Sequence, residues 1–284
     1  MSATVRAAVV GAGSWGTALA CLLAKRGHDV ALWSFEEEVV RSIEGGNGNP
    51  YLPGAELPSG LQATNDLGAA VAGAELVVSV SPSQFVGQVI AEAAPHIAPE
   101  ALVISASKGI EIESLRRMEE VMGEVLPGPV MERFCVLSGP SFAVEVAREE
   151  PTAVVVASAD RGAADRAQAL FQTPYFRVYT NPDVVGVELA GALKNVIALA
   201  AGAAAGLGFG HNTLAALITR GLAEMKRLGL ALGAEKATFS GLAGMGDLVL
   251  TCTGSLSRNR TVGYRLGQGE SLEAILSDMK AVAE

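Results

Sequence analysis

The run Gly11-Ala-Gly13-Ser-Trp-Gly16 is the feature that most restricts the possible folds of this chain. It follows an apolar stretch, Arg6–Val10, that reads as a strand, and it opens a helical pattern over Ser14–Arg26. Glycine at the first two positions allows a tight turn and a close approach of backbone to phosphate, and the third lets helix and strand pack closely. The alternative is a tight turn with a purely structural role. In this context the motif predicts a strand–turn–helix unit that binds a dinucleotide.

The pattern of the whole chain of 284 residues changes once. In the first two thirds, short β-branched runs alternate with alanine-rich helical stretches, which predicts a mostly parallel sheet with helices on both faces. The expected fold class is therefore α/β, with a Rossmann-type sheet. The expected elements include a loop over Gly45–Ser59 and a helix over Ser114–Gly123.

From about Thr180 the sequence is rich in Ala, Leu and Gly and shows no convincing strand. We therefore expect two domains: a dinucleotide-binding Rossmann domain over residues 1–180 and an all-helical, substrate-binding domain over residues 181–284. The helical pattern stops at Glu284 without a cap or a Gly/Pro stop signal, which hints that this second domain is truncated at its C-terminal end.

Composition and charge exclude several classes of protein. Hydrophobic residues make up 50% and charged residues 18%, the opposite of a disordered chain. The net charge of −9 argues against binding to nucleic acid or to an anionic membrane surface. The apolar stretch Val196–Gly210 is too short for a membrane span. Three scattered cysteines and three histidines without ligand spacing predict no metal site, and reduced thiols suit the cytoplasm.

Three consecutive glutamates bear on which dinucleotide would bind. An acidic residue about 20 positions after the glycines often binds the ribose of adenosine. Glu36, Glu37 and Glu38 lie in that region, with no Arg or Lys beside them to hold a 2′-phosphate. This pattern favours NAD over NADP. The alternative is that the glutamates are solvated residues in the first turn of a helix, where the helix dipole favours negative charge.

Two polar segments follow predicted strands, at the edge where parallel sheets bind ligands. Lys108, within Ser107–Glu111, is placed to touch a ligand oxygen, although by itself it reads as an ordinary surface lysine. The second segment, Ser138–Ala143, offers small residues before a helix start and could equally be only a loop.

Two features of the helical half indicate chemistry. Lys194 lies in an almost wholly apolar helical stretch, and a buried lysine is costly and often serves in general acid–base catalysis. The alternative is a lysine that reaches solvent at the helix edge. Ser257, Arg258 and Asn259 straddle a predicted helix start, where an Arg fork and free N–H groups would bind a small phosphate. The alternative there is a capped, solvated loop.

Five segments together resemble the bacterial NAD(P)-dependent glycerol-3-phosphate dehydrogenase family. They are GAGSWGTALA (Gly11–Ala20), SKGIE (Ser107–Glu111), SGPSFAVEVA (Ser138–Ala147), ELAGALKNVIALAAG (Glu188–Gly202) and GLAGMGDLVLTCTGSLSRNRTVG (Gly241–Gly263). The last two are highly specific. The resemblance implies reversible reduction of dihydroxyacetone phosphate to sn-glycerol 3-phosphate with NAD or NADP, for glycerophospholipid synthesis. It also implies a soluble cytoplasmic enzyme, commonly a homodimer, whose family members usually run some tens of residues further.

The resemblance assigns roles to single residues. It implies that Lys194 is the general acid/base and that Lys108, the second catalytic residue, contacts both substrate and cofactor. The implied substrate-binding residues are Lys108, Gly139, Ser141, Lys194, Asp247, Ser257, Arg258 and Asn259. The implied cofactor-binding residues are Gly11, Gly13, Ser14, Trp15, Gly16, Lys108, Ala143, Arg258, Val282 and Glu284. Where the family often has a basic residue or His, this chain has Phe35-Glu36, which argues against NADP.

Two other functions stay open at this point. A two-domain dehydrogenase of similar plan, such as a 3-hydroxy-acid dehydrogenase or a ketopantoate reductase, has no need of the phosphate cluster at Ser257–Asn259. A regulator that binds a nicotinamide cofactor without chemistry would show tight binding and no turnover.

Overall fold

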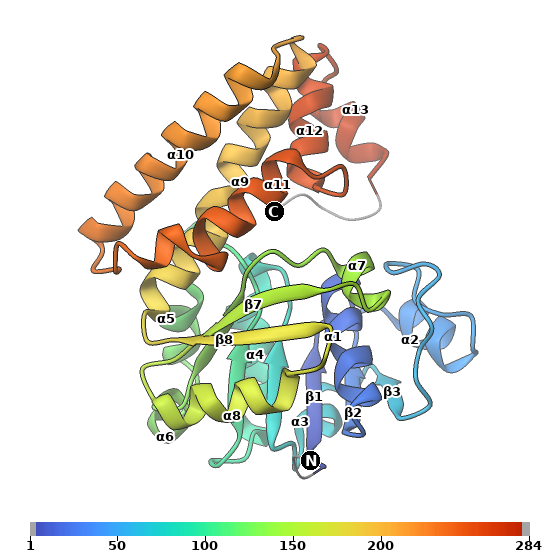
Figure 1. The fold of residues 1–284 in the computed structure, drawn as a ribbon. Helices are drawn as coiled ribbons and strands as arrows, with labels where there is room; N and C mark the ends of the chain where they lie inside the picture. The colour runs from blue at the N-terminus through green and yellow to red at the C-terminus, as the bar shows by residue number, and fades with distance from the viewer. Residues whose placement is uncertain (1–3, 280–284) are drawn as a thin grey trace. The chain divides into compact units, whose positions relative to one another are not determined.

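Eight strands form one sheet in the computed structural model, which describes residues 4–279 (Figure 1). The strands are β1 (Arg6–Val10), β2 (Asp29–Trp33), β3 (Leu61–Thr64), β4 (Leu76–Ser79), β5 (Leu102–Ser105), β6 (Cys135–Ser138), β7 (Thr152–Ala157) and β8 (Phe176–Asn181). Their order is β3-β2-β1-β4-β5-β6-β7-β8. The pairs from β3 through β6 are parallel, as is the pair of β7 and β8. The expected mostly parallel sheet is confirmed.

Helices follow these strands and bury both faces of the sheet. They are α1 (Ser14–Lys25), α2 (Glu37–Glu44), α3 (Leu67–Val71), α4 (Val86–Ala93), α5 (Met118–Gly123), α6 (Gly128–Met131), α7 (Ala143–Ala147) and α8 (Arg161–Phe171). Leu76 and Val78 of β4 pack into a core with Leu19 of α1 and Phe171 of α8. Val77 points to the opposite face and is equally buried. Because both faces are covered, the central strands are continuous apolar runs.

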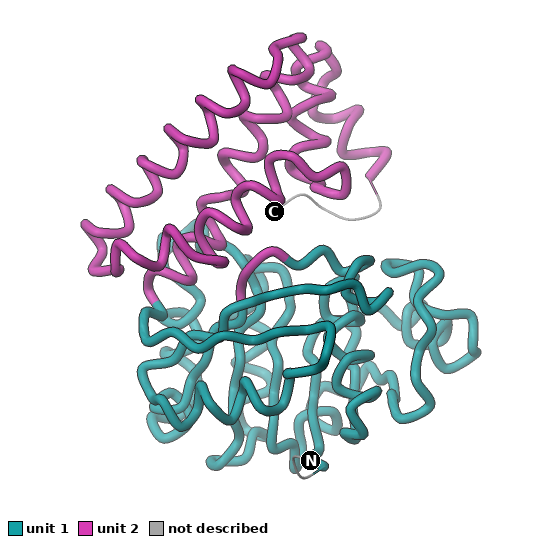
Figure 2. The backbone as a smooth tube through the Cα atoms, viewed as in Figure 1, with its two compact units in different colours: residues 1–137, 141–184 teal, residues 138–140, 185–284 magenta. Residues whose placement is uncertain are grey.

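The chain divides into two compact units (Figure 2). The first contains the residues up to Leu137 and Ser141–Val184, and the second contains Ser138–Pro140 and the residues from Val185 onward. The helices of the second unit are α9 (Val184–Gly206), α10 (His211–Ala231), α11 (Asp247–Thr253), α12 (Arg258–Gly267) and α13 (Leu272–Ser277). A π-helical turn, Leu242–Gly246, runs directly into α11. Among residues 4–279, α9 is the one helix whose length and apolar composition would suffice to cross a membrane. Within the protein, 61% of its most apolar stretch is buried, as in a core helix.

Two elements of the first unit differ from the prediction. The predicted helix over Ser114–Gly123 begins only at Met118. Leu115 adopts a left-handed φ of 58°, and the Glu120 carboxylate accepts a hydrogen bond from the Arg117 N–H, which caps the helix there. The second difference is β3, which the sequence pattern does not predict. This strand has only four residues and lies at the sheet edge, so it lacks a buried, β-branched run.

The packing of α9 against α12 depends on glycine. A Cβ atom at Gly202 of α9 would overlap the carbonyl oxygen of Arg260, and one at Gly263 of α12 would overlap the carbonyl oxygen of Leu199. The two helix backbones are therefore in direct contact, and no larger residue fits. Since α9 also carries Lys194, this contact sets the start of α12 relative to that lysine.

His28 makes the stability of the first unit dependent on pH. It is buried, and its Nδ1 accepts a hydrogen bond from the Val5 N–H at 3.3 Å. Burial, with the nearby Arg26, lowers the pKa of His28. Below about pH 6.5 the unfolded chain therefore binds more protons than the folded chain, and the free energy of unfolding falls as the pH falls.

We expect the melting temperature to drop between about pH 7.5 and about pH 5.5, and to drop less in His28→Asn, whose side-chain oxygen can still accept the Val5 bond. Thermal scans of both proteins at the two pH values would measure this. Equal drops in the melting temperature of the two proteins would show that His28 is not the cause of the pH dependence.

Candidate active site

The glycine-rich turn has the geometry of a phosphate cradle. Gly11 follows β1 with a φ of 124°, and a Cβ there would lie 2.9 Å from the backbone of Val80, which follows β4. A Cβ at Gly16 would overlap the Gly11 carbonyl oxygen, whereas one at Gly13 would meet nothing within 4 Å. Helix α1 begins at Ser14 without a side-chain cap, so its first N–H groups can bind an anion. The turn therefore fits a pyrophosphate.

Two side chains beside this turn support the same assignment. The buried Asn49 donates from Nδ2 to the Ala12 carbonyl at 2.9 Å and to Thr17 Oγ1 at 2.7 Å, which holds the turn in place. The indole N–H of Trp15 is buried and finds no acceptor within residues 4–279. A buried donor of this kind normally serves a ligand or a water molecule. The sequence does not single out Asn49, because one Asn in a Gly/Pro/Asn-rich loop gives no signal.

Glu36 is distinct from the two glutamates that follow it. Its Oε1 accepts a hydrogen bond from the Tyr51 hydroxyl at 2.6 Å, and its Oε2 accepts one from Ser34 Oγ at 3.4 Å. The bond to Glu36 raises the pKa of Tyr51. Glu37 and Glu38 are exposed in the first turn of α2. Of these three glutamates, Glu36 is therefore the one whose carboxylate is fixed by hydrogen bonds near the end of β2.

Lys108 lies in the loop after β5, which is held against the loop after β4. Ser107 Oγ donates to the carbonyl oxygen of Ser81 at 2.6 Å, and a Cβ at Gly109 would collide with the Ser83 side chain. Lys108 itself is partly buried. Because β1, β4 and β5 are parallel neighbours, the glycine-rich turn and the Lys108 loop follow the same edge of the sheet.

The segment after β6 contributes to both units. Gly139 has a φ of 131°, and the Pro140 ring lies 3.6 Å from the position of a Cβ at Gly246. The structure therefore places Gly139-Pro140 beside the start of α11, within the second unit. Ser141 and Ala143, the latter the first residue of α7, belong to the first unit.

A buried ion pair is the central feature of the second unit. Lys194 Nζ donates to Asp247 Oδ1 at 2.7 Å and to Thr251 Oγ1 at 3.0 Å. Lys194 is 8% exposed and Asp247 is 1% exposed. A buried charge pair is tolerated only with good geometry and additional hydrogen bonds, which this pair has. The alternative of a solvent-reaching lysine is therefore wrong.

Thr251 is a residue of this cluster that the sequence analysis missed. Its hydroxyl lies 2.6 Å from the backbone carbonyl of Asp247 and 3.3 Å from Asp247 Oδ1. The signal that could have found it is spacing, since residues four apart on α11 share one helix face.

The predicted phosphate cluster forms the start of α12. Ser257 is buried and caps the helix, because its Oγ accepts a hydrogen bond from the Arg260 N–H at 3.2 Å. Arg258 is exposed and Asn259 is partly buried in the first turn. Ser257 therefore caps the helix, as expected for a capped loop, while its hydroxyl hydrogen can still donate a hydrogen bond to a ligand. Val282 and Glu284, predicted to contact the cofactor, lie outside the described residues.

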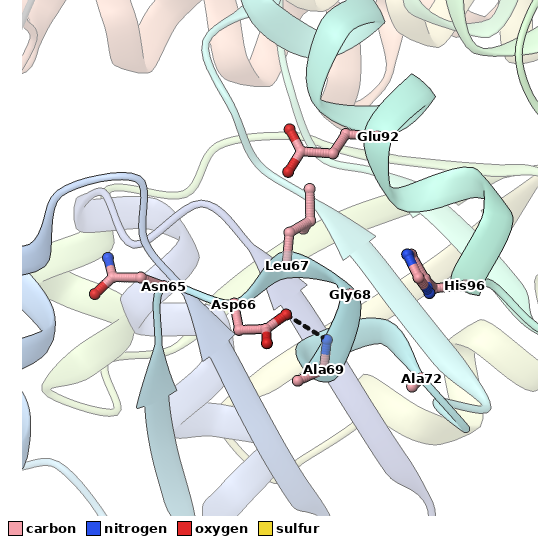
Figure 3. A pocket seen from close by; sticks show the side chains of 8 residues that line it. All are labelled: Asn65, Asp66, Leu67, Gly68, Ala69, Ala72, Glu92 and His96. Atoms are coloured by element: carbon pink, nitrogen blue, oxygen red, sulfur yellow. Dashed lines mark hydrogen bonds between the residues drawn. The ribbon is translucent and has the colours of Figure 1, made fainter.

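The first unit also has a surface pocket of about 530 Å³ (Figure 3). It is lined by Asn65, Asp66, Leu67, Gly68, Ala69, Ala72, Glu92 and His96, and contains none of the predicted site residues. Asp66 is engaged in capping α3, since its Oδ1 accepts from the Ala69 N–H at 2.8 Å. Within the described part of the chain, no group of three His, Cys, Asp or Glu residues is placed to hold a metal ion.

Comparisons with known proteins identify the family of this chain. Residues 6–164 match the model of the NAD-dependent glycerol-3-phosphate dehydrogenase N-terminus, and residues 183–284 match that of its C-terminus. The chain belongs to the NAD-dependent glycerol-3-phosphate dehydrogenase family. A relative from Geobacter metallireducens, named glycerol-3-phosphate dehydrogenase (NAD(P)+), is 63% identical over 97% of this chain and 83% of its own length. One of the same name from Leptospira biflexa is 53% identical over 97% of this chain and 83% of its own length.

Solved structures of the family have the same fold. A crystal structure of glycerol-3-phosphate dehydrogenase from Coxiella burnetii is 40% identical, with a TM-score of 0.93 over 99% of this chain and 85% of that chain. The Saccharomyces cerevisiae enzyme is 31% identical, with a TM-score of 0.82 over 99% of this chain and 87% of that chain. The family predicted from the five sequence segments is therefore confirmed.

Proposed function

We propose that this chain catalyses the reversible, NAD(P)H-dependent reduction of dihydroxyacetone phosphate to sn-glycerol 3-phosphate, for glycerophospholipid synthesis. The buried Lys194–Asp247 pair carries the proposal, because it supplies a fixed proton donor in a chain of this family. The test is oxidation of NADH with dihydroxyacetone phosphate, compared with unphosphorylated dihydroxyacetone. NADH oxidation that requires the phosphate group of the substrate supports the proposal. The absence of NADH oxidation with either substrate contradicts it.

Lys194 is proposed as the general acid. When bound, the reduced nicotinamide supplies a hydride to the carbonyl carbon of the substrate. Lys194 Nζ donates its proton to the carbonyl oxygen as that atom becomes an alkoxide, and takes the proton back in the reverse direction. The Asp247 carboxylate at 2.7 Å stabilises the charged amine and, with Thr251, fixes where Nζ lies. Lys108 is proposed to stabilise the developing charge and to contact both substrate and cofactor.

The remaining predicted residues are proposed to bind the two ligands. Residues 1–180 would form the dinucleotide-binding domain, and the helical part, residues 181–284, would form the substrate-binding domain. The proposed substrate-binding residues are Gly139, Ser141, Asp247, Ser257, Arg258 and Asn259. The proposed cofactor-binding residues are Gly11, Gly13, Ser14, Trp15, Gly16, Ala143, Arg258, Val282 and Glu284.

Arg258 is proposed to bind the substrate phosphate, far from the reacting carbon. Arg258→Ala removes a charge-assisted hydrogen bond, so the KM for dihydroxyacetone phosphate should rise about 10- to 100-fold. Steady-state kinetics would measure this, with Arg220→Ala as a matched control, since Arg220 is 69% exposed on α10. If Arg258→Ala weakened only cofactor affinity, the phosphate role would be wrong.

The association state and location are also proposals. We propose a cytoplasmic homodimer that binds neither nucleic acid nor a membrane, as the net charge of −9 suggests. Val196, Leu207 and Phe209 at α9 and its C-terminal end are 64%, 65% and 58% exposed, which supports an apolar face for a second copy. The free cysteines Cys21, Cys135 and Cys252 suit a reducing compartment. Sedimentation equilibrium would test the dimer, and cell fractionation the location.

A further inference from the structure

The sheet ends in two edge strands, β3 and β8, each of which pairs with a neighbour on one side only (Figure 1). An edge strand presents a row of backbone N–H and C=O groups to which a strand of another molecule can add. These groups alternate in direction along a strand, so the bonds to the inner neighbour show which residues face outward. The partners of the outward groups therefore decide whether an edge is open to a second molecule.

The hydrogen bonds between β7 and β8 define the outward residues of β8. The Thr152 N–H donates to the Tyr175 carbonyl at 2.7 Å, directly before β8. The Ser158 N–H donates to the Asn181 carbonyl at 3.1 Å, at the end of β8. The odd-numbered residues of β8 thus direct their backbone groups toward β7, and the even-numbered residues direct theirs away from the sheet.

Side chains of α8 and of the turn after it bind the outward groups of β8. The Val178 N–H donates to Gln172 Oε1 at 2.9 Å, and Gln168 Nε2 donates to the Val178 carbonyl at 2.7 Å. The Phe176 N–H donates to Thr173 Oγ1 at 2.8 Å, and the Thr173 N–H donates to the Phe176 carbonyl at 3.0 Å. The N–H and C=O groups of both outward residues are therefore already paired within the molecule.

The opposite edge, β3, has a similar arrangement. The Ser34 N–H after β2 donates to the Thr64 carbonyl at 3.0 Å, so the even-numbered residues of β3 face β2 and the odd-numbered ones face outward. The outward Ala63 N–H donates at 2.7 Å to Oε1 of Glu44, the last residue of α2. The N–H of Leu61, also outward, donates to a carbonyl oxygen of the preceding loop at 3.0 Å. A side chain from a neighbouring helix thus binds an outward group at each end of the sheet.

The β8 edge is within reach of another molecule. A surface hollow of about 260 Å³ at this edge is lined in part by Gln168, Gln172 and Arg177, and Tyr179 is 47% exposed. Backbone groups in such a place could bind water instead at little cost in free energy. Holding two long glutamine side chains in one conformation costs entropy, so these bonds add little to stability. Their clearer effect is to occupy the place of an additional strand.

We infer that these side chains, here called the edge caps, prevent a second copy of this chain from adding a strand to the sheet. The edge caps are Glu44, Gln168, Gln172 and Thr173. A second copy is the relevant partner because it carries the same edges, and a strand edge can pair with its own copy about a two-fold axis. The inference does not depend on the proposed reaction. It restricts the proposed homodimer to surfaces other than the two sheet edges.

The double variant Gln168→Ala/Gln172→Ala tests the caps of β8, because it frees both outward groups of Val178 while alanine favours the helix α8. The melting temperature should stay near that of the parent. Light scattering over a range of concentrations should show species larger than those of the parent. The association constant should rise about tenfold or more, the equivalent of two added backbone hydrogen bonds. Gln88→Ala removes an exposed glutamine of α4 and should behave as the parent.

Adding Thr180→Pro to the double variant separates strand addition from nonspecific aggregation. Thr180 is an even-numbered residue of β8, so its N–H points outward, and proline removes a donor that an added strand needs. The larger species should then disappear. Species of the parent's size in Gln168→Ala/Gln172→Ala at all concentrations, or larger species that persist with Thr180→Pro, would each overturn the inference.

Hydrogen exchange in dilute solution tests a single cap without requiring assembly. The Val178 amide should exchange slowly in the parent and about threefold faster or more in Gln172→Ala, which removes its acceptor. This variant loses one hydrogen bond only, so the measurement remains possible if the double variant fails to fold. Equal exchange of the Val178 amide in the parent and in Gln172→Ala would show that Gln172 does not protect this edge, and would overturn the inference.

Discussion

Replacing Lys194 with methionine is expected to lower kcat for dihydroxyacetone phosphate by about 100- to 10,000-fold, the usual contribution of a general acid. Methionine keeps much of the length of the side chain but cannot donate a proton. The affinity for ADP-ribose should stay near that of the parent, since Lys194 is not among the proposed cofactor-binding residues. Steady-state kinetics and calorimetry on the same protein would separate the two effects.

The same substitution also leaves a charge buried. Asp247 is 1% exposed, and losing its partner costs about 3–5 kcal/mol in typical buried pairs. The double variant Lys194→Met/Asp247→Asn removes both charges, so it should recover much of the stability but none of the turnover. Near-normal turnover in a folded Lys194→Met protein would refute the assignment of Lys194 as the general acid.

The second large effect is expected at the contact of α9 with α12. Gly202→Ala places a Cβ where the Arg260 carbonyl oxygen lies, so the two helices must separate. We expect a loss of about 3 kcal/mol or more in the free energy of unfolding, measured in urea. Gly210→Ala is a matched control, because a Cβ there meets nothing within 4 Å. It should change the free energy of unfolding by about 0.5 kcal/mol or less.

Gly202→Ala should also affect binding. Helix α12 begins at Arg258, a proposed ligand of the substrate phosphate, so moving the helix should raise the KM for the substrate. Stability losses of the same size in Gly202→Ala and Gly210→Ala would show that the contact of the two helices does not limit stability.

The sequence predicted those parts of the molecule that depend on local patterns. The glycine-rich turn and the mostly parallel sheet each follow from neighbouring residues. Contacts between distant residues could not be predicted in this way. Lys194 and Asp247 are 53 positions apart, and Asn49 and Thr17 are 32 apart. Periodicity in one sequence does not show which residues of two different elements meet.

Two glycines of the helical unit show the same limit of prediction from a single sequence. From the sequence alone, Gly202 and Gly263 are only residues of low helix propensity within predicted helices. In the structure each lies against the backbone of the other helix. A glycine needed for close approach cannot be told from an incidental one until its partner is known. Tyr51 is similar, since a tyrosine 15 positions after Glu36 gives no sign that its hydroxyl binds that carboxylate.

The most direct test of the central claim is the rate of NADH oxidation with dihydroxyacetone phosphate, followed by absorbance and repeated with unphosphorylated dihydroxyacetone. We predict rapid turnover with the phosphorylated substrate and little with the other, because Arg258 and Asn259 are expected to bind the phosphate while Lys194 donates the proton. Equal rates with the two substrates would contradict the phosphate site. No turnover by a protein that still binds NADH would contradict the proposed reaction itself.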